Sequence, residues 1–172
     1  MKKLKSTWYN MAIVLTGIAT VAGAALGYVN SITAPTIEAL KAQQEKQAEQ
    51  EVLNGQEGTA VKTSYSKGFG GPLTVMVGLA KDGTILGYKV LESSETPGLG
   101  AKAQDWFQKG QKGDIIGKKA GNLKVSKEGG EVDAITASTI TSKAFLHCIN
   151  DAYKTLSENP DAQSGATVKG ER

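Results

Sequence analysis

A long run without charge opens the chain. Residues 6–37 carry no charged side chain, and only Thr16 and Thr20 interrupt the apolar stretch from Met11 to Val29. At about 1.5 Å of rise per residue, a helix over this stretch is about 28 Å long, close to the roughly 30 Å hydrocarbon core of a bilayer. The pattern predicts a transmembrane helix over residues 11–30.

Charges and aromatic residues at the two edges of the run predict its orientation. Three lysines precede it and aromatic side chains flank it: Lys2, Lys3 and Lys5 come first, then Trp8, Tyr9 and Tyr28. Positive residues stay on the cytoplasmic side of a bilayer, and Trp and Tyr favour its interfaces. Residues 1–10 are therefore expected in the cytoplasm and the rest of the chain outside it, at the cell (inner) membrane.

Two other interpretations of the run are a cleaved signal peptide and a buried helix of a soluble core. Ala22-Gly23-Ala24 resembles the cleavage site of a signal peptide. However, the apolar stretch continues past Ala24 to Val29, and its length without charge is unusual for a soluble core. A retained membrane anchor is therefore favoured.

A polar segment follows, and residues 31–59 are interpreted as a stalk or linker. The stretch Ala39–Glu51 is rich in strong helix formers and has almost no apolar face. Pro35 is expected to mark a break or a helix start, because proline lacks the N–H of a helix interior. The domain proper is expected over residues 60–156, and the polar tail 157–172 is expected to be extended or disordered.

The first part of this domain has the pattern of a β-hairpin. Apolar residues recur along two short segments on either side of Asp82-Gly83: Val75, Val77 and Leu79, then Ile85, Tyr88 and Val90. Asp-Gly between two such segments is a strong turn signal. The pattern predicts strands over residues 73–80 and 84–91.

Shorter elements follow the hairpin. We expect a short helix over residues 104–108 with Trp106 and Phe107 facing inward, and short strands over 122–126 and 132–135. Apolar residues at helical spacing predict a helix over 142–156, capped by Thr141 or Ser142. The expected fold class is α+β: a single domain with an antiparallel sheet and packed helices.

Composition narrows the chemistry. The chain has 172 residues, with 20 Lys and Arg against 17 Asp and Glu, and no strongly basic cluster, so no nucleic-acid partner is expected. Cys148 is the lone cysteine, which excludes an internal disulfide and an iron–sulfur cluster. His147 is the lone histidine, which excludes a His-rich metal site. Any redox or ionic chemistry must therefore come from a bound cofactor or from carboxylates and hydroxyls, and no metal is expected. Cys148 is expected in the core and His147 at the surface.

Two segments could bind that cofactor. Ser93–Lys102 contains Glu95-Thr96-Pro97-Gly98-Leu99-Gly100, whose glycines allow close approach of the backbone to a flat ligand. Its alternative is an ordinary Pro-Gly turn. Asp133–Ser142 has five hydroxyl side chains just before the best helix, where free N–H groups favour a phosphate. A threonine there could also form a phosphate ester, and the alternative is a simple helix cap.

Together these residues resemble the FMN-binding domain family. Gly70-Gly71-Pro72-Leu73, the Asp82-Gly83 hairpin, Glu95–Gly100 and Thr136–Ser142 occur in the family's order. With the N-terminal anchor, the chain resembles the G subunit of the Rnf-type ferredoxin:NAD⁺ oxidoreductase, a relative of the C subunit of the sodium-pumping NADH:quinone reductase. The resemblance spans roughly residues 1–155.

The resemblance implies covalent FMN. In that family a flavin transferase uses FAD to join FMN by a phosphoester to a threonine in a pattern near D-x-x-[ST]-G-A-[TS]. Asp133, Thr136 and Thr139 match the pattern, which makes Thr139 the expected attachment residue. Ala137 stands where Gly is usual, and Ser138, where Ala is usual, is the rival acceptor. The expected cofactor-binding set is Glu95, Thr96, Gly98, Leu99, Gly100, Thr136, Ala137, Ser138, Thr139 and Thr141.

The implied function is electron transfer within a membrane complex. The chain would act as an electron-transfer subunit of a redox-driven translocase of Na⁺ or H⁺, with no catalytic side chain of its own. Its partners would be the other membrane subunits, the flavin transferase and membrane lipid, while ferredoxin and NAD⁺ would react elsewhere. The alternatives are a stand-alone extracytoplasmic FMN-binding reductase and a non-redox anchored binding module.

Overall fold

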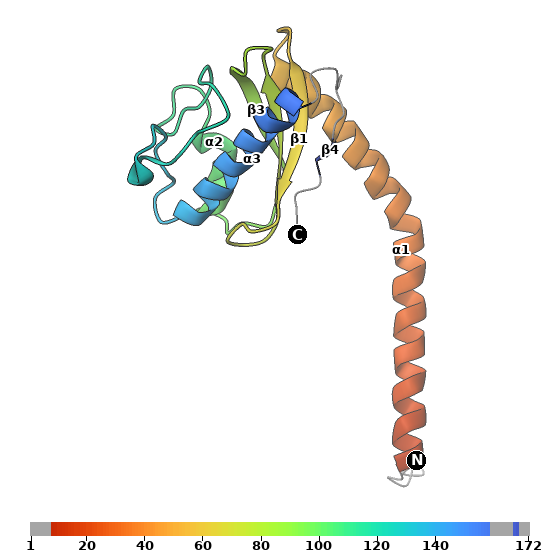
Figure 1. Cartoon of the computed structure of the whole chain (residues 1–172). Coiled ribbons are helices and arrows are strands. Elements are labelled where there is room, and N and C mark those ends of the chain that lie inside the picture. The colour runs from red at the N-terminus through yellow and green to blue at the C-terminus, as the bar shows by residue number, and fades with distance from the viewer. Residues whose placement is uncertain (1–7, 159–166, 169–172) are drawn as a thin grey trace. The chain divides into compact units, whose positions relative to one another are not determined.

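The computed structural model describes residues 8–158 and 167–168, and the chain divides into two units. The first unit comprises residues 1–43 and the second residues 44–172. A single helix, α1 (Trp8–Leu53), contributes to both (Figure 1). Lys2, Lys3 and Lys5 lie outside the described residues.

The first unit is an exposed apolar helix. Within the described part of the chain, α1 is the one helix whose length and composition suit a membrane crossing, and none of its most apolar window is buried. The expected break at Pro35 is wrong, because α1 continues through it. A proline removes one backbone donor, and the long helical segments on both sides keep the helix continuous.

The second unit is built on a sheet in the order β3-β2-β1-β4 (Figure 1). Its strands are β1 (Thr59–Tyr65), β2 (Leu73–Leu79), β3 (Ile85–Ser93) and β4 (Thr167–Val168). β1, β2 and β3 pair antiparallel, and β4 pairs with β1 in parallel. The hairpin prediction is confirmed: β2 and β3 pair, and both carboxylate oxygens of Asp82 accept hydrogen bonds from Thr84 in the turn. Neither β1 nor β4 was expected from the sequence pattern.

Helices and turns complete the domain. They are the 3-10 helices η1 (Gly100–Lys102) and η2 (Ser126–Glu128), and the α-helices α2 (Ala103–Trp106) and α3 (Thr139–Glu158). The expected strands 122–126 and 132–135 are wrong, since η2 and its neighbouring turns leave only a single bridge between Val125 and Val132. α3 begins earlier than expected, so Thr141 and Ser142 are buried inside its first turn instead of capping it.

The main core lies between the sheet and α3. The rings of Phe107 and Phe145 stack with centroids 4.4 Å apart, and Tyr88 packs edge-on against Phe145. Phe107 is fully buried, as expected, whereas Trp106 is half-buried and its indole N–H donates to the carbonyl of Asp133. These contacts fix the segment after β3 and the segment before α3 on the same end of the core.

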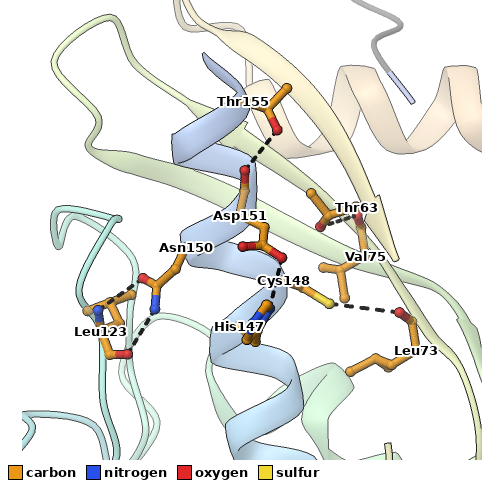
Figure 2. Close-up of polar contacts among 9 residues, drawn as sticks. All are labelled: Thr63, Leu73, Val75, Leu123, His147, Cys148, Asn150, Asp151 and Thr155. Carbon is orange, nitrogen blue, oxygen red and sulfur yellow. Dashed lines mark hydrogen bonds and ion pairs between the residues drawn. The ribbon is translucent and has the colours of Figure 1, made fainter. Parts of the chain in front are cut away.

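Cys148 and His147 lie where the helical pattern predicts. Cys148 is buried on α3 and its thiol contacts the carbonyl of Leu73 at 3.8 Å (Figure 2). Burial raises the pKa of this thiol to about 12. His147 is exposed on the same helix. The thiol therefore stays protonated at neutral pH and acts as a core side chain.

The other face of the sheet packs against the end of α1. Ala48 and Val52 are buried there together with Ala60 and Met76. Gly78 of β2 lies so close that an added Cβ would come within 2.4 Å of the carbonyl oxygen of Val52. Both faces of β2 are thus covered. The compact unit begins near Gln44, whereas the sequence pattern suggested a polar stalk up to residue 59.

Candidate functional site

A tight turn positions the hydroxyl-rich segment in front of α3. The N–H of Ser138 donates to the carbonyl of Ile135 at 3.0 Å, and Ala137 has a left-handed φ of 61°. This is the hydrogen bond of a β-turn whose third residue needs a positive φ, a conformation that glycine adopts without strain. The family's preference for glycine at this position thus has a conformational reason, and Ala137 adopts the same conformation despite its Cβ.

Ser142 fixes this turn to the helix. Its hydroxyl accepts a hydrogen bond from the N–H of Ile135 at 2.9 Å and donates to the carbonyl of Ser138 at 2.9 Å. The N–H of Ser142 also donates to the carbonyl of Ser138, which is the first bond of the helix. Three hydrogen bonds from one buried residue therefore hold the segment that precedes α3.

The hydroxyl side chains at the helix start differ in accessibility. Ser138 is 8% exposed, and its Oγ lies 3.3 Å from Oγ1 of the fully buried Thr141. Thr139 is only half-buried. The amides of a first helical turn have no intrahelical acceptor and lie at the positive end of the helix dipole. Thr139 is thus more accessible than Ser138 or Thr141, and it lies beside a group of donors that favours an anion.

Glu95 links the loop after β3 to the glycine-rich segment after β1. The residue is 7% exposed, and its Oε1 accepts a hydrogen bond from the N–H of Phe69 at 2.9 Å. Among the described residues, Oε2 of Glu95 is buried without a hydrogen-bond partner. A buried carboxylate oxygen without a donor is costly, so this atom indicates a place where a ligand donor fits.

Gly100 marks the meeting point of the two predicted motifs. An added Cβ at Gly100 would lie 2.5 Å from Oε2 of Glu95 and 2.8 Å from Oγ1 of Thr141. The space that a side chain would fill is therefore already bounded by the two motifs. Gly98 is different: it has a φ of 80° and open space around its Cα, so it is required by the turn and not by close packing.

A pocket of about 350 Å³ opens where the two motifs meet. Its lining consists of Phe69, Glu95, Thr96, Leu99, Gly100, Ala137, Ser138, Thr139, Ile140 and Thr141. Eight of the ten expected cofactor-binding residues line it, and Gly98 and Thr136 do not. Phe69 and Ile140 were not expected from the sequence; Phe69 lies within the Gly68–Gly71 segment, which was the available signal.

The rim of this pocket is apolar. Phe69 is 67% exposed, Ile140 55% and Leu99 40%. Outside α1, these are the exposed large hydrophobic residues in the described part of the chain, and all three line the same pocket. Concentration of exposed apolar area around a concave site is typical of a ligand-binding site. The site thus combines an apolar rim, a carboxylate and an accessible hydroxyl at a helix start.

Comparison with known proteins identifies the family. Residues 68–154 match the FMN-binding domain. The chain is 32% identical to the G subunit of the Na⁺-translocating ferredoxin:NAD⁺ oxidoreductase complex of Acetobacterium woodii, over 91% of this chain and 98% of that protein. It is 34% identical to the G subunit of the ion-translocating oxidoreductase complex of Vibrio atlanticus, over 64% of this chain and 55% of that protein. It is 33% identical to the corresponding G subunit of Shewanella piezotolerans, over 58% of this chain and 49% of that protein. The chain therefore belongs to the FMN-binding domain family and, within it, to the G subunits of ion-translocating oxidoreductase complexes.

Proposed function

We propose that this chain is a membrane-anchored flavoprotein subunit that carries FMN on Thr139 and relays electrons within an Rnf-type ferredoxin:NAD⁺ oxidoreductase complex. The electron relay would be coupled to translocation of Na⁺ or H⁺. Support comes from the Acetobacterium woodii relative, which is named as a subunit of a Na⁺-translocating complex of this kind. When bound, FMN supplies the redox chemistry, and the protein sets its position and environment.

The observation that carries this proposal is the pocket between Glu95–Gly100 and the start of α3. Its residues fit FMN in three respects. Apolar side chains at the rim suit a flat ring system, and the unpartnered Oε2 of Glu95 suits a donor on a ligand. The start of α3 suits a phosphate, because its amides and dipole favour a negative charge.

Accessibility supports Thr139 as the attachment residue. Both Thr139 and Ser138 line the pocket, but Thr139 is half-buried, whereas Ser138 is buried with its hydroxyl beside that of Thr141. In the attachment reaction, the Thr139 hydroxyl would lose its proton to the solvent, Oγ would bond to the phosphorus of the FMN half of FAD, and the P–O–P bond of FAD would break so that AMP leaves. The resulting phosphodiester keeps one negative charge, which donors at the helix start can stabilise.

The remaining side chains would hold the ring and exclude water. Phe69, Leu99 and Ile140 would cover its apolar edges, and their burial by a ligand is favourable by about 25 cal/mol per Å² of apolar surface. Glu95 would accept a hydrogen bond and, through Oε1, keep the segment around Phe69 in place. Gly98 and Thr136 would contribute through the shape of their turns.

We further propose an arrangement at the membrane. Residues 11–30 would span the cell membrane, the N-terminal lysines would remain cytoplasmic, and the FMN domain would lie on the extracytoplasmic side. Other membrane subunits of the complex would supply and receive electrons. A flavin transferase would be needed for maturation, and lipid would surround the span.

The intact mass of the purified chain tests the proposal. Expression with a flavin transferase should give a mass increased by one FMN less one water, and the modified peptide should contain Thr139. Flavin absorbance should remain with the denatured, precipitated chain. An unmodified mass would contradict covalent FMN, and purification from native membranes without other membrane subunits would favour a stand-alone reductase.

A further inference from the structure

A second pocket of about 360 Å³ lies beside the first. It is an open pocket bordered by the end of β1, the loop that contains η2, and α3. Its lining consists of Tyr65, Lys67, Leu123, Lys124, Val125, Glu128, Ile140, Lys143, Ala144, Leu146, His147 and Asn150. Ile140 lines both pockets, so the two sites share this one residue.

Asn150 fixes the wall formed by the loop. Its Oδ1 accepts hydrogen bonds from the N–H groups of Gly121 and Leu123 at 3.1 and 3.0 Å. Its amide nitrogen donates to the carbonyl of Leu123 at 3.0 Å (Figure 2). One side chain of α3 therefore satisfies three backbone groups of the loop, which gives the pocket a defined shape.

An aromatic pair forms another wall. The rings of Tyr65 and His147 stack with centroids 4.4 Å apart and planes inclined by 30°. Nδ1 of His147 lies 2.8 Å from a carboxylate oxygen of Asp151, which orients the imidazole (Figure 2). The apolar side chains of Leu123 and Ala144 line the same space. The pocket therefore offers flat and apolar surface in addition to polar groups.

The charges in the lining are unbalanced. Lys143 forms an ion pair with Glu128 at 2.5 Å. Among the residues that the structure describes, Lys67 and Lys124 take part in no ion pair, although both line the pocket. Three lysines against one glutamate leave two positive charges before any contribution from His147. A dianion would therefore balance this lining better than a monoanion.

We propose that this second pocket binds a phosphate monoester with a small ring or apolar body. A phosphate monoester carries a charge of about −1.5 to −2 at pH 7 and offers three strong acceptor oxygens, which matches the two unpaired lysines. The pocket volume lies in the range of small-molecule sites, roughly 300–1,000 Å³, so there is room for an organic body against Tyr65 and His147. This proposal rests on residues that take no part in the proposed attachment of FMN.

Three probes that share a phenyl ring and differ in charge test the contribution of charge to binding. Phenyl phosphate is a dianion, benzenesulfonate a monoanion and phenol uncharged, and each carries the same ring. Isothermal titration calorimetry of the full-length chain in detergent should give the tightest binding for phenyl phosphate and the weakest for phenol. Inorganic phosphate should bind more weakly than phenyl phosphate, because it makes no contact with the aromatic wall.

Matched lysine variants locate the site. Lys67→Ala and Lys124→Ala should each weaken phenyl phosphate binding by about two- to fivefold, the range expected for exposed charge pairs. Lys127→Ala removes the same charge from the same loop but from a residue that does not line the pocket, and should leave binding unchanged. Circular dichroism of each variant checks that the fold is retained.

The outcomes separate this proposal from the proposed function. Equal binding of all three probes would mean that the charge of the ligand does not contribute, and an equal effect of Lys127→Ala and Lys124→Ala would mean diffuse attraction of anions. Either result would overturn the proposal. The titrations are made on the chain with and without attached flavin. Phenyl phosphate binding that depends on Lys124 in a chain that never accepts flavin would contradict the proposed function alone.

Discussion

Glu95 accepts a hydrogen bond through Oε1 from the N–H of Phe69, a residue 26 positions earlier in the chain. This bond joins the loop after β3 to the segment after β1, while Oε2 of the same carboxylate is buried and has no partner in the described part of the chain. One side chain thus serves two purposes: one oxygen maintains the pocket wall and the other is free for a ligand.

Substitutions of Glu95 should separate these two purposes. Glu95→Gln keeps an oxygen for Phe69, so the free energy of unfolding should fall by less than about 1 kcal/mol. The flavin spectrum and midpoint potential should nevertheless shift, because a donor replaces the acceptor Oε2. Glu95→Ala leaves the amide of Phe69 without its partner and should cost about 1–3 kcal/mol. An unchanged potential in Glu95→Gln would show that Oε2 does not face the flavin.

Thr139→Val should abolish covalent flavin while the protein still folds, because valine keeps the β-branched shape and lacks the hydroxyl. Thr139→Ser retains a hydroxyl and should still be modified to some extent. Ser138→Ala should keep the flavin, since the Ser138 hydroxyl is buried beside Thr141. Peptide mass spectrometry measures each case. Covalent flavin in Thr139→Val together with its loss in Ser138→Ala would move the attachment to Ser138.

Ala137→Gly should stabilise the protein. Ala137 has a left-handed φ, which costs a residue with a Cβ about 1–2 kcal/mol, and glycine removes this cost. The greater backbone entropy that glycine loses on folding offsets about 0.5–1 kcal/mol of the improvement. The free energy of unfolding should therefore rise by about 0.5–1 kcal/mol in a urea titration. Ala101→Gly, at a position without positive φ, provides the control and should lower it. A loss of stability in Ala137→Gly would contradict the strain assigned to this turn.

Gly100 and Gly98 should respond differently to alanine. In Gly100→Ala the new Cβ would collide with Glu95 and Thr141, which should cost about 1–3 kcal/mol and reduce the flavin content of the folded protein. In Gly98→Ala the Cβ meets open space, so the cost is that of the backbone conformation, about 1–2 kcal/mol. Flavin content per folded molecule should remain normal in Gly98→Ala. Equal flavin loss in both variants would argue against Gly100 as the boundary of the pocket.

The proposed membrane orientation can be tested with a single introduced cysteine. The native thiol of Cys148 is buried and its pKa is raised to about 12, so it should remain silent toward maleimides at neutral pH. Ser164→Cys in the C-terminal tail should be labelled in intact cells by a membrane-impermeant maleimide. The unsubstituted chain is the control. Labelling of Ser164→Cys only after lysis would place the domain in the cytoplasm.

The sequence predicted the parts of the fold that depend on local signals. The Asp82-Gly83 turn and the apolar spacing of α3 are complete within short segments, so the hairpin and the helix both form, although α3 begins three residues earlier than expected. β1 was missed because its burial depends on neighbours on both faces of the sheet, including the end of α1. The short strands near Val125 and Val132 were wrong because residues of high β-propensity there are held by turns.

The candidate site was predictable to the extent that its motifs are contiguous. Thr139 and Glu95 were found within such motifs, but the approach of the two motifs at Gly100, where Glu95 and Thr141 lie close together, depends on tertiary packing. Ile140 could not be found, because an isolated apolar residue near a helix start has no periodicity to distinguish a site wall from a core contact. Gly98 was expected to lie against the ligand, and its sequence context does not distinguish a turn requirement from close packing.

The side chain shared by the two pockets, Ile140, has a thermodynamic consequence. An occupant of one pocket that displaces Ile140 changes the wall of the other, and such coupling must be reciprocal. A phosphate monoester that alters the flavin midpoint potential would itself bind with an affinity that depends on the flavin's oxidation state. Potentiometric titration with and without phenyl phosphate measures this linkage, and Ile140→Ala should weaken it. The oxidation state of the flavin would then change the occupancy of the second pocket, a site that takes no part in electron transfer.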